Sequence, residues 1–289
     1  RKDFMNSVLI LGASGLLGRA IVDEFRNRSF IIGALGRNSL NLNSNQIKEY
    51  CVDILDYEKL ASIISQYDFI INCTGQISAP INQCLIQNTD GINNIVDAVK
   101  KYNKKLLHFS SVSVYGSSEY VNEESDLNPE SIYASIKCFS EHVIDRNLDS
   151  SLILRVSNLY GGNQTKGIVS YLSRQYMAGM HDLDFNNNGE MQRYYLNVSE
   201  LAEITYLAIC KDLKPGSYNV IGSDFLTIKE LVGKFNSILS YSFFVKYSAS
   251  PPMENIQKID DRKIREELNI DIHSTIDFYI KSIKNDPKK

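Results

Sequence analysis

The chain has 289 residues, of which 43% are apolar, and its formal net charge at pH 7 is −3. This length and apolar content are sufficient for one large domain, or for one domain with a smaller lobe. The weak negative charge provides no basic field for nucleic acid or a membrane surface, so neither is expected as a partner.

The N-terminal stretch "RKDFMNSVLILG" is charged and then apolar, but the apolar run stops at Gly12 and no small-residue cleavage site follows. We therefore expect no secretory signal. Met5 is a candidate native start, with residues 1–4 as a remnant of expression. No apolar stretch reaches the roughly 18 residues that a transmembrane helix needs. Five widely spaced cysteines without a CxxC motif, and four scattered histidines, predict a cytoplasmic protein with reduced thiols and no metal site.

The first 160 residues alternate between two patterns. Apolar runs typical of buried strands cover residues 7–12, 30–36, 47–54, 67–75, 105–116 and 151–162, and the last two run into a loop. Segments with apolar residues at helical spacing cover 16–28, 56–64, 91–102 and 131–145. The alternation predicts an α/β fold with a Rossmann-type, doubly wound parallel sheet and helices on both faces. Ligands bind such sheets at the carboxyl ends of the strands, where the strand order reverses.

After residue 162 the alternation becomes less regular. Strands are expected at 193–198 and 216–222, and helices at 199–209, 227–235 and 274–283. The helix at 227 should start there because Thr227 and Glu230 have the spacing of a capping box. We interpret residues 5–162 as an NAD(P)-binding domain and residues 163–289 as mostly a smaller α/β substrate-binding lobe, partly interwoven with the first.

The first apolar run ends in "GASGLLG", with glycines at positions 12, 15 and 18. Such glycines allow a tight turn and a close approach of the backbone to a pyrophosphate, which the following helix N-terminus attracts. The cofactor contacts expected from this loop are Gly12, Ser14, Gly15, Leu16, Leu17 and Gly18. An ordinary strand-to-helix turn is the alternative, but the position after a first strand favours dinucleotide binding.

The end of the second apolar run, "ALGRNS", is expected to select the cofactor. An acidic residue there would bind the ribose 2′-hydroxyl of NAD, whereas an arginine suits a 2′-phosphate. The sequence has Arg37 and no carboxylate, which favours NADP(H) while NAD stays possible. Arg37 as a solvated surface cation is the alternative. Asp53, with Ile54, is expected near the adenine, and Gly75 leaves room for the cofactor.

Three further segments, "SSVSVYG" (110–116), "SIYASIK" (131–137) and "RVSNLYG" (155–161), fall at or beyond the ends of expected strands. Together with "GASGLLG" they resemble the extended short-chain dehydrogenase/reductase family, whose members act mostly on nucleotide-diphosphate sugars. The resemblance covers nearly the whole chain. It implies Ser111, Tyr133 and Lys137 as catalytic residues, with Tyr133 and Lys137 also contacting the cofactor.

The spacing of Tyr133 and Lys137 has a chemical reason. Residues four apart share one face of a helix, so Lys137 can place its ammonium near the Tyr133 phenol and the nicotinamide ribose. We expect that charge to lower the pKa of Tyr133 from about 10 toward working pH, for proton exchange with the reacting oxygen. Ser111 would hydrogen-bond that oxygen, with Ser110 and Ser113 as the neighbours that could be mistaken for it. One exposed turn of an ordinary helix is the alternative.

The resemblance also narrows the reaction. Family members that dehydrate the sugar carry an Asp-Glu pair directly after the catalytic Ser/Thr, where this chain has Val112 and Ser113. That leaves an NADPH-dependent reductase of a nucleotide-diphosphate 4-keto-(deoxy)sugar, or a nucleotide-sugar 4-epimerase using bound NAD(P). Arg37 favours the reductase. A non-catalytic NADP-binding regulator is the alternative of another class, but such relatives typically lose the tyrosine or the lysine.

Substrate contacts are likewise implied by the resemblance: Arg193 for the phosphates of the sugar nucleotide, and Asn158, Ser111 and Ser113 for the substrate. A second diphosphate-binding arginine has no counterpart, because residues 246–258 offer only lysines. Arg155 is expected to be structural. The helices at 91–102 and 131–147 correspond to those that pair in many relatives, so a homodimer is expected.

Overall fold

The computed structural model describes residues 7–42, 46–75, 81–185, 188–249 and 253–285; the expectations for residues 1–4 and Met5 lie outside these ranges. Its centre is a seven-stranded parallel sheet in the order β10-β6-β5-β4-β1-β2-β3. The order reverses between β1 and β4, which confirms the doubly wound Rossmann-type sheet. The strands are β1 (Ser7–Leu11), β2 (Ile31–Gly36), β3 (Ile47–Cys51), β4 (Phe69–Asn72), β5 (Lys105–Ser111), β6 (Ser151–Val156) and β10 (Gly216–Val220).

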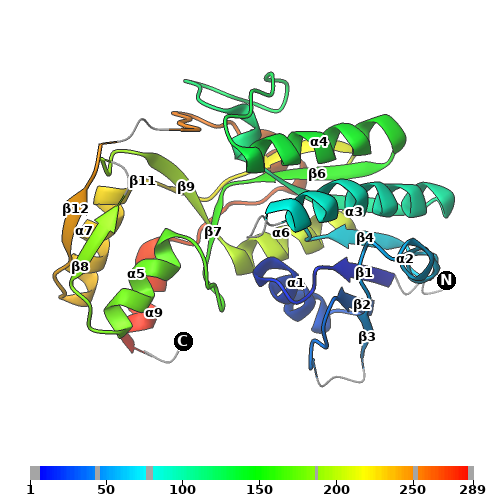
Figure 1. The fold of residues 1–289 in the computed structure, drawn as a ribbon, viewed down its shortest axis with the longest axis horizontal. Coiled ribbons are helices and arrows are strands. Elements are labelled where there is room, and N and C mark those ends of the chain that lie inside the picture. Colours follow the sequence, from blue (N-terminus) through cyan, green and yellow to red (C-terminus); the bar gives the residue numbers. More distant parts are fainter. Residues whose placement is uncertain (1–6, 43–45, 76–80, 186–187, 250–252, 286–289) are drawn as a thin grey trace.

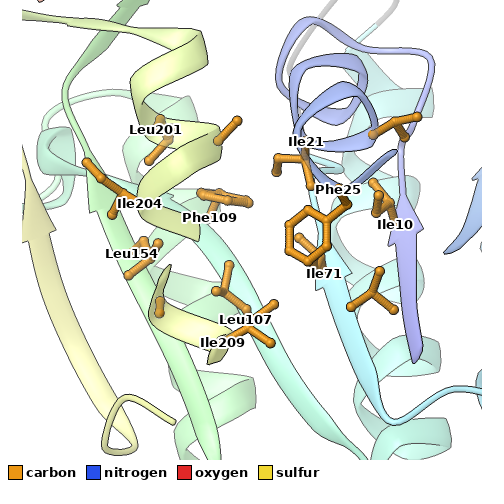
Figure 2. Close-up of a cluster of buried hydrophobic side chains, with 14 of the residues drawn as sticks. Ile10, Ile21, Phe25, Ile71, Leu107, Phe109, Leu154, Leu201, Ile204 and Ile209 are labelled. Atoms are coloured by element: carbon orange, nitrogen blue, oxygen red, sulfur yellow. The ribbon is translucent and has the colours of Figure 1, made fainter. Parts of the chain in front are cut away.

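Helices cover both faces of this sheet (Figure 1). One face carries α1 (Leu16–Arg26), α6 (Val198–Cys210) and α8 (Arg262–Leu268), and the other carries α2 (Tyr57–Ile64), α3 (Ile81–Lys101) and α4 (Ile132–Asn147). Figure 2 shows the first of these cores, where Phe25 of α1 and Ile204 of α6 lie over the strands that carry Ile71 and Phe109. Because both faces are buried, the inner strands appear in the sequence as continuous apolar runs, whereas the edge strand β3 is mostly exposed and carries Lys48 and Glu49.

A second group of elements lies beside the sheet (Figure 1). Its strands form a three-stranded sheet and a parallel pair, and its helices enclose a separate apolar cluster that includes Leu172, Phe235 and Ile280. The elements are β7 (Asn158–Tyr160), β8 (Asp182–Phe185), β9 (Gln192–Asn197), β11 (Asp224–Thr227), β12 (Phe244–Tyr247), α5 (Ile168–Met177), α7 (Ile228–Leu239) and α9 (Ile276–Asn285). The domain boundary after residue 162 stays a proposal, with β10, α6 and α8 returning to the central sheet.

One helix differs from expectation for a physical reason. Helix α3 begins at Ile81 rather than at residue 91, and Gly91 lies inside it. A Cβ on Gly91 would lie 2.5 Å from the Ile54 side chain, so this glycine permits close packing and does not mark a helix start. Residues 105–116 form a strand that runs into a loop, as expected: β5 ends at Ser111, and Val112–Tyr115 forms a short 3₁₀ turn, η1.

The capping box of α7 is confirmed. The Thr227 hydroxyl accepts from the Glu230 backbone N–H at 3.0 Å, and the Glu230 carboxylate accepts from the Thr227 N–H at 2.7 Å. No helix in the described ranges has the length and apolarity needed to cross a membrane.

Candidate active site

The loop between β1 and α1 has the shape that its glycines predict. Gly12 adopts a φ of +76°, and a Cβ there would lie 3.2 Å from the carbonyl group of Cys73. A Cβ on Gly18 would lie 2.3 Å from the Gly12 oxygen, so Gly18 serves the packing of α1 against the loop. Helix α1 has no side-chain cap and no acidic residue in its first turn. Its first N–H groups and partial positive charge therefore suit a pyrophosphate.

Two adjoining cavities extend from this loop along the carboxyl ends of β1, β2 and β4. The smaller, about 220 Å³, is lined by Arg37, Asp53 and Ile54, among others; the larger, about 520 Å³, is lined by Leu16, Leu17, Tyr133, Lys137 and Asn158, among others. Both are bordered by Gly15, Cys73, Thr74 and Gly75, and Ser14 lines the smaller one. The glycine cradle and the elongated groove fit a dinucleotide, which the residues assigned from the sequence would hold.

Arg37 and Asp53 lie at the far end of this groove. Arg37 is exposed, and its backbone carbonyl accepts from the Cys51 thiol at 3.1 Å. The Asp53 carboxylate accepts from the Leu55 N–H at 3.0 Å and so also shapes the turn into α2. Strand β2 ends at Gly36 without a carboxylate, which leaves Arg37 as the charged residue next to the expected ribose position.

Tyr133 and Lys137 lie in the first turns of α4, where Ser131 caps the helix by accepting from the Ala134 N–H. Lys137 is 4% exposed, its Nζ donates to the Phe109 carbonyl at 2.8 Å, and it lies 5.9 Å from the centre of the Tyr133 ring. A Cβ on Gly75 would lie 2.9 Å from this Nζ, so the glycine leaves space for the ammonium group.

The pKa of Tyr133 moves in the direction opposite to the expected one. Burial raises the pKa of Tyr133 to about 12, and burial also lowers the pKa of Lys137 to about 8. The desolvation of a buried phenolate outweighs any help from Lys137, whose ammonium is aimed at the Phe109 carbonyl. Tyr133 is therefore protonated at neutral pH and able to donate a proton.

Ser111 is the serine that contacts Tyr133. Its hydroxyl accepts from the Ser113 hydroxyl at 2.9 Å and from the Ser113 N–H at 3.2 Å. Its interaction with the Tyr133 phenol lowers the pKa of Tyr133 against the effect of burial. Ser110 lies elsewhere: it is buried on the wall of the larger cavity, and its hydroxyl has no partner among the described residues.

A small pocket of about 40 Å³ adjoins Ser111, and Ser111, Ser113, Asn158 and Arg193 line it. Asn158 also borders the larger cavity, which links the pocket to the dinucleotide groove. The Arg193 guanidinium donates to the carbonyls of Gln192 at 2.8 Å and Met253 at 2.6 Å. Burial lowers the pKa of Arg193. Its contact with a diphosphate stays a prediction.

Sequence reasoning missed three residues at this site. Asn88 of α3 and Lys137 both lie next to Gly75. The Asn88 Oδ1 is 2.9 Å from the position that a Cβ on Gly75 would take. His108 is buried beside Lys137, and its Nδ1 lies 3.0 Å from the Asn72 amide. Glu254 lines the small pocket, although residues 246–258 were searched only for cations. For His108 and Asn88 the one sequence signal was a polar residue inside an apolar run or a helix, which names no role, and Glu254 in its loop had no such signal.

Comparisons with known proteins agree with this geometry. A model of the NAD dependent epimerase/dehydratase family matches residues 8–220. Methionine adenosyltransferase 2 subunit beta from Xenopus laevis is 24% identical over 241 residues, covering 77% of this chain and 69% of that protein.

Solved structures share the fold. The dTDP-glucose 4,6-dehydratase of Bacillus anthracis in complex with NAD has a TM-score of 0.85 at 20% identity, covering 97% of this chain and 96% of that one. The UDP-glucuronic acid 4-epimerase of Bacillus cereus in complex with UDP-glucuronic acid and NAD has a TM-score of 0.85 at 19% identity, covering 96% and 98%. The resemblance to extended short-chain dehydrogenases/reductases is confirmed, and the chain belongs to the NAD-dependent epimerase/dehydratase family.

Proposed function

We propose that this protein is an NADPH-dependent reductase of the 4-keto group of a nucleotide-diphosphate sugar. The observation that carries the proposal is the meeting of Ser111, Tyr133 and Lys137 between a dinucleotide groove and a small pocket. Asn158 and Arg193 in that pocket offer an amide and a guanidinium to the substrate. A planar guanidinium fork suits a diphosphate.

The side chains divide the chemistry between them. Bound NADPH would supply the hydride. Ser111 and Tyr133 would hydrogen-bond the carbonyl oxygen of the sugar and fix its carbon in the reacting position. Tyr133, protonated at neutral pH, would give its proton to that oxygen as negative charge develops there. Lys137, buried behind it, would stabilise the phenolate that remains and donate to the cofactor ribose.

Two features favour reduction over the other family reactions. Arg37 stands at the end of β2 in place of a carboxylate, which suits NADP. Val112 and Ser113 follow the catalytic serine in η1, so the site lacks there the acidic pair that elimination of water would need.

A 4-epimerase is the second candidate, favoured by solved relatives named as 4-epimerases with NAD bound. It would use the same Tyr133 alternately as base and acid. A non-catalytic NADP-binding regulator is favoured by the relatives named as a beta subunit of methionine adenosyltransferase. The combination of Ser111, Tyr133 and Lys137 in one site argues against that role, since nucleotide binding alone does not require a proton donor.

The test measures NADPH oxidation by the purified protein with a panel of 4-keto-sugar nucleotides. We expect turnover by the wild type and a loss of at least 100-fold in kcat for Tyr133→Phe, with little change in NADPH binding. Full activity of the Phe variant would remove Tyr133 from the mechanism.

The nucleotide that the protein retains on purification separates the candidates. Tightly held NAD together with interconversion of 4-epimers would favour the epimerase. NADPH binding without turnover of any sugar nucleotide would favour the regulator.

A further inference from the structure

Glu254 contributes a carboxylate to the substrate pocket from a segment far along the chain. The pocket is lined by Ser111, Ser113 and Arg193 as well as by Glu254. Among its described lining residues, Arg193 and Glu254 are the charged ones. A sugar that enters this pocket next to Ser111 therefore also meets Glu254.

Three contacts fix Glu254 in place. Its backbone N–H donates to the Glu130 carboxylate at 2.5 Å, and the Ser131 hydroxyl donates to its side chain. The preceding carbonyl, of Met253, accepts from Arg193 at 2.6 Å. Glu254 also adopts a φ of +53°, which is uncommon for a residue other than glycine and is maintained here by these contacts. The carboxylate is thus a built part of the pocket, anchored to the N-terminal cap of the catalytic helix.

Arg193 is the cation of the pocket that interacts electrostatically with this carboxylate, and its guanidinium is also held by main-chain carbonyls. The Arg193 guanidinium is engaged by the carbonyls of Gln192 and Met253. Glu130 adds a second carboxylate, which accepts from the Ser117 N–H at 2.8 Å and hydroxyl at 2.9 Å. Consistent with an active negative charge near the reacting group, Glu254 is among the causes that raise the pKa of Tyr133, after burial.

We propose that Glu254 determines specificity: it accepts hydrogen bonds from hydroxyl or ammonium groups of the sugar and excludes sugars that carry a carboxylate, such as uronic acids. This inference rests on the proposed function, because it requires a nucleotide-linked sugar in the pocket. Its physical basis is that two carboxylates a few ångströms apart in a partly buried site repel strongly, whereas a hydroxyl donor gains a charge-assisted hydrogen bond.

The experiment compares UDP-glucose with UDP-glucuronic acid, and dTDP-glucose with its uronic acid counterpart, by calorimetric titration of the NADP-saturated protein. We expect the wild type to bind the neutral sugar at least tenfold more tightly than its uronate. Glu254→Gln should narrow that ratio at least fivefold, mainly by tighter binding of the uronate. Glu124→Gln, which removes an exposed carboxylate from another loop, should leave the ratio unchanged.

Equal or tighter binding of the uronate by the wild type would overturn the inference while leaving the proposed function intact. The inference would also be overturned if Glu254→Gln still bound the neutral sugar and left the ratio of the two affinities unchanged. Ser131→Ala keeps the charge but removes its anchor, so a ratio that narrows as much in this variant would assign the effect to loop placement and overturn the role of the charge. Failure of every sugar nucleotide to bind would instead remove the proposed function, and this inference with it.

Discussion

At the scale of single residues, the burial of Lys137 sets the balance between stability and activity. Its Nζ lies inside the protein with the Phe109 carbonyl as acceptor, and burial lowers its pKa from 10.5 to about 8. Glu141 and Cys73 act in the other direction but do not outweigh burial. A buried charged group whose desolvation lowers the stability of the fold is common at functional sites, where the reaction requires it.

We expect Lys137→Met to stabilise the cofactor-free protein at pH 7 while abolishing activity. The unfolded chain binds a proton at Lys137 up to pH 10.5, whereas the folded chain releases it near pH 8. The stability of the wild type relative to the variant therefore rises between pH 8 and pH 10.5. At pH 7 the free energy of unfolding of the variant should exceed that of the wild type by up to about 3 kcal/mol, and this difference should shrink between pH 8 and pH 10.5.

Urea unfolding at pH 7 and pH 9.5, followed by circular dichroism because the chain has no tryptophan, measures this difference. Lys281→Met, at an exposed position on α9, is the control and should show no such pH dependence. A pH-independent difference between wild type and Lys137→Met would contradict the burial of a titrating ammonium.

At the scale of elements, a buried polar network fastens α4 to the sheet. Glu141 of α4 and Arg155 of β6 form an ion pair at 2.8 Å, with both side chains buried. Arg155 also donates to the Tyr115 hydroxyl of η1 at 2.8 Å, and that hydroxyl donates to Asn219 of β10 at 2.7 Å. These contacts give Arg155 the structural place expected for it, and they hold the turn after Ser111 against α4.

Breaking this pair on one side should be costly. Glu141→Gln leaves the Arg155 charge buried without its partner, and we expect a loss of about 3–5 kcal/mol in the free energy of unfolding. The double replacement Glu141→Leu with Arg155→Met removes both charges and should recover most of that loss. Chemical denaturation of the three proteins measures both effects. A double variant no more stable than Glu141→Gln would show that the pair itself, rather than charge desolvation, dominates.

At the scale of the whole molecule, the sequence predicts the central sheet well because parallel strands are buried on both faces. Strands β1, β2, β4, β5 and β6 coincide with apolar runs, and the "GASGLLG" loop marks where the sheet begins. The second lobe was predicted only in part. Strands β8, β11 and β12 have four residues each and partly exposed faces, so they lack a pattern that separates them from loops.

The residues of the candidate site were likewise predictable from the sequence only in part. The spacing of Tyr133 and Lys137, and the position of Ser111, are visible because they lie on one helix and one strand end. The pKa shift of Tyr133 cannot be predicted from the sequence, because it depends on how deeply the surrounding elements bury the phenol. Glu254 is not visible either, because it is more than 100 residues from Ser131 and meets it only after both lobes have folded.

The last expectation at this scale is a homodimer formed through α3 and α4. The two helices pack against each other on one face of the sheet, yet both keep large apolar side chains exposed to solvent. These are Leu85 and Ile86 on α3, and Ile132 and Phe139 on α4. An exposed apolar surface of this kind is typical of a protein–protein interface. A symmetric dimer would bury the same patch of both copies.

We expect light scattering coupled to size-exclusion chromatography to give twice the 32.7 kDa mass of one chain. Combining Ile86→Glu with Phe139→Glu places like charges in the proposed interface and should give a folded monomer, because unpaired charges are costly to bury at an interface. Phe278→Glu is the matched control: this phenylalanine is 76% exposed on α9 in the second lobe, and its replacement should leave the dimer intact. A monomeric wild type would contradict the dimer. A double variant that still dimerises would show that the interface lies elsewhere. Because α4 carries Tyr133 and Lys137, NADPH titration of the monomeric variant also measures whether the active site depends on dimerisation.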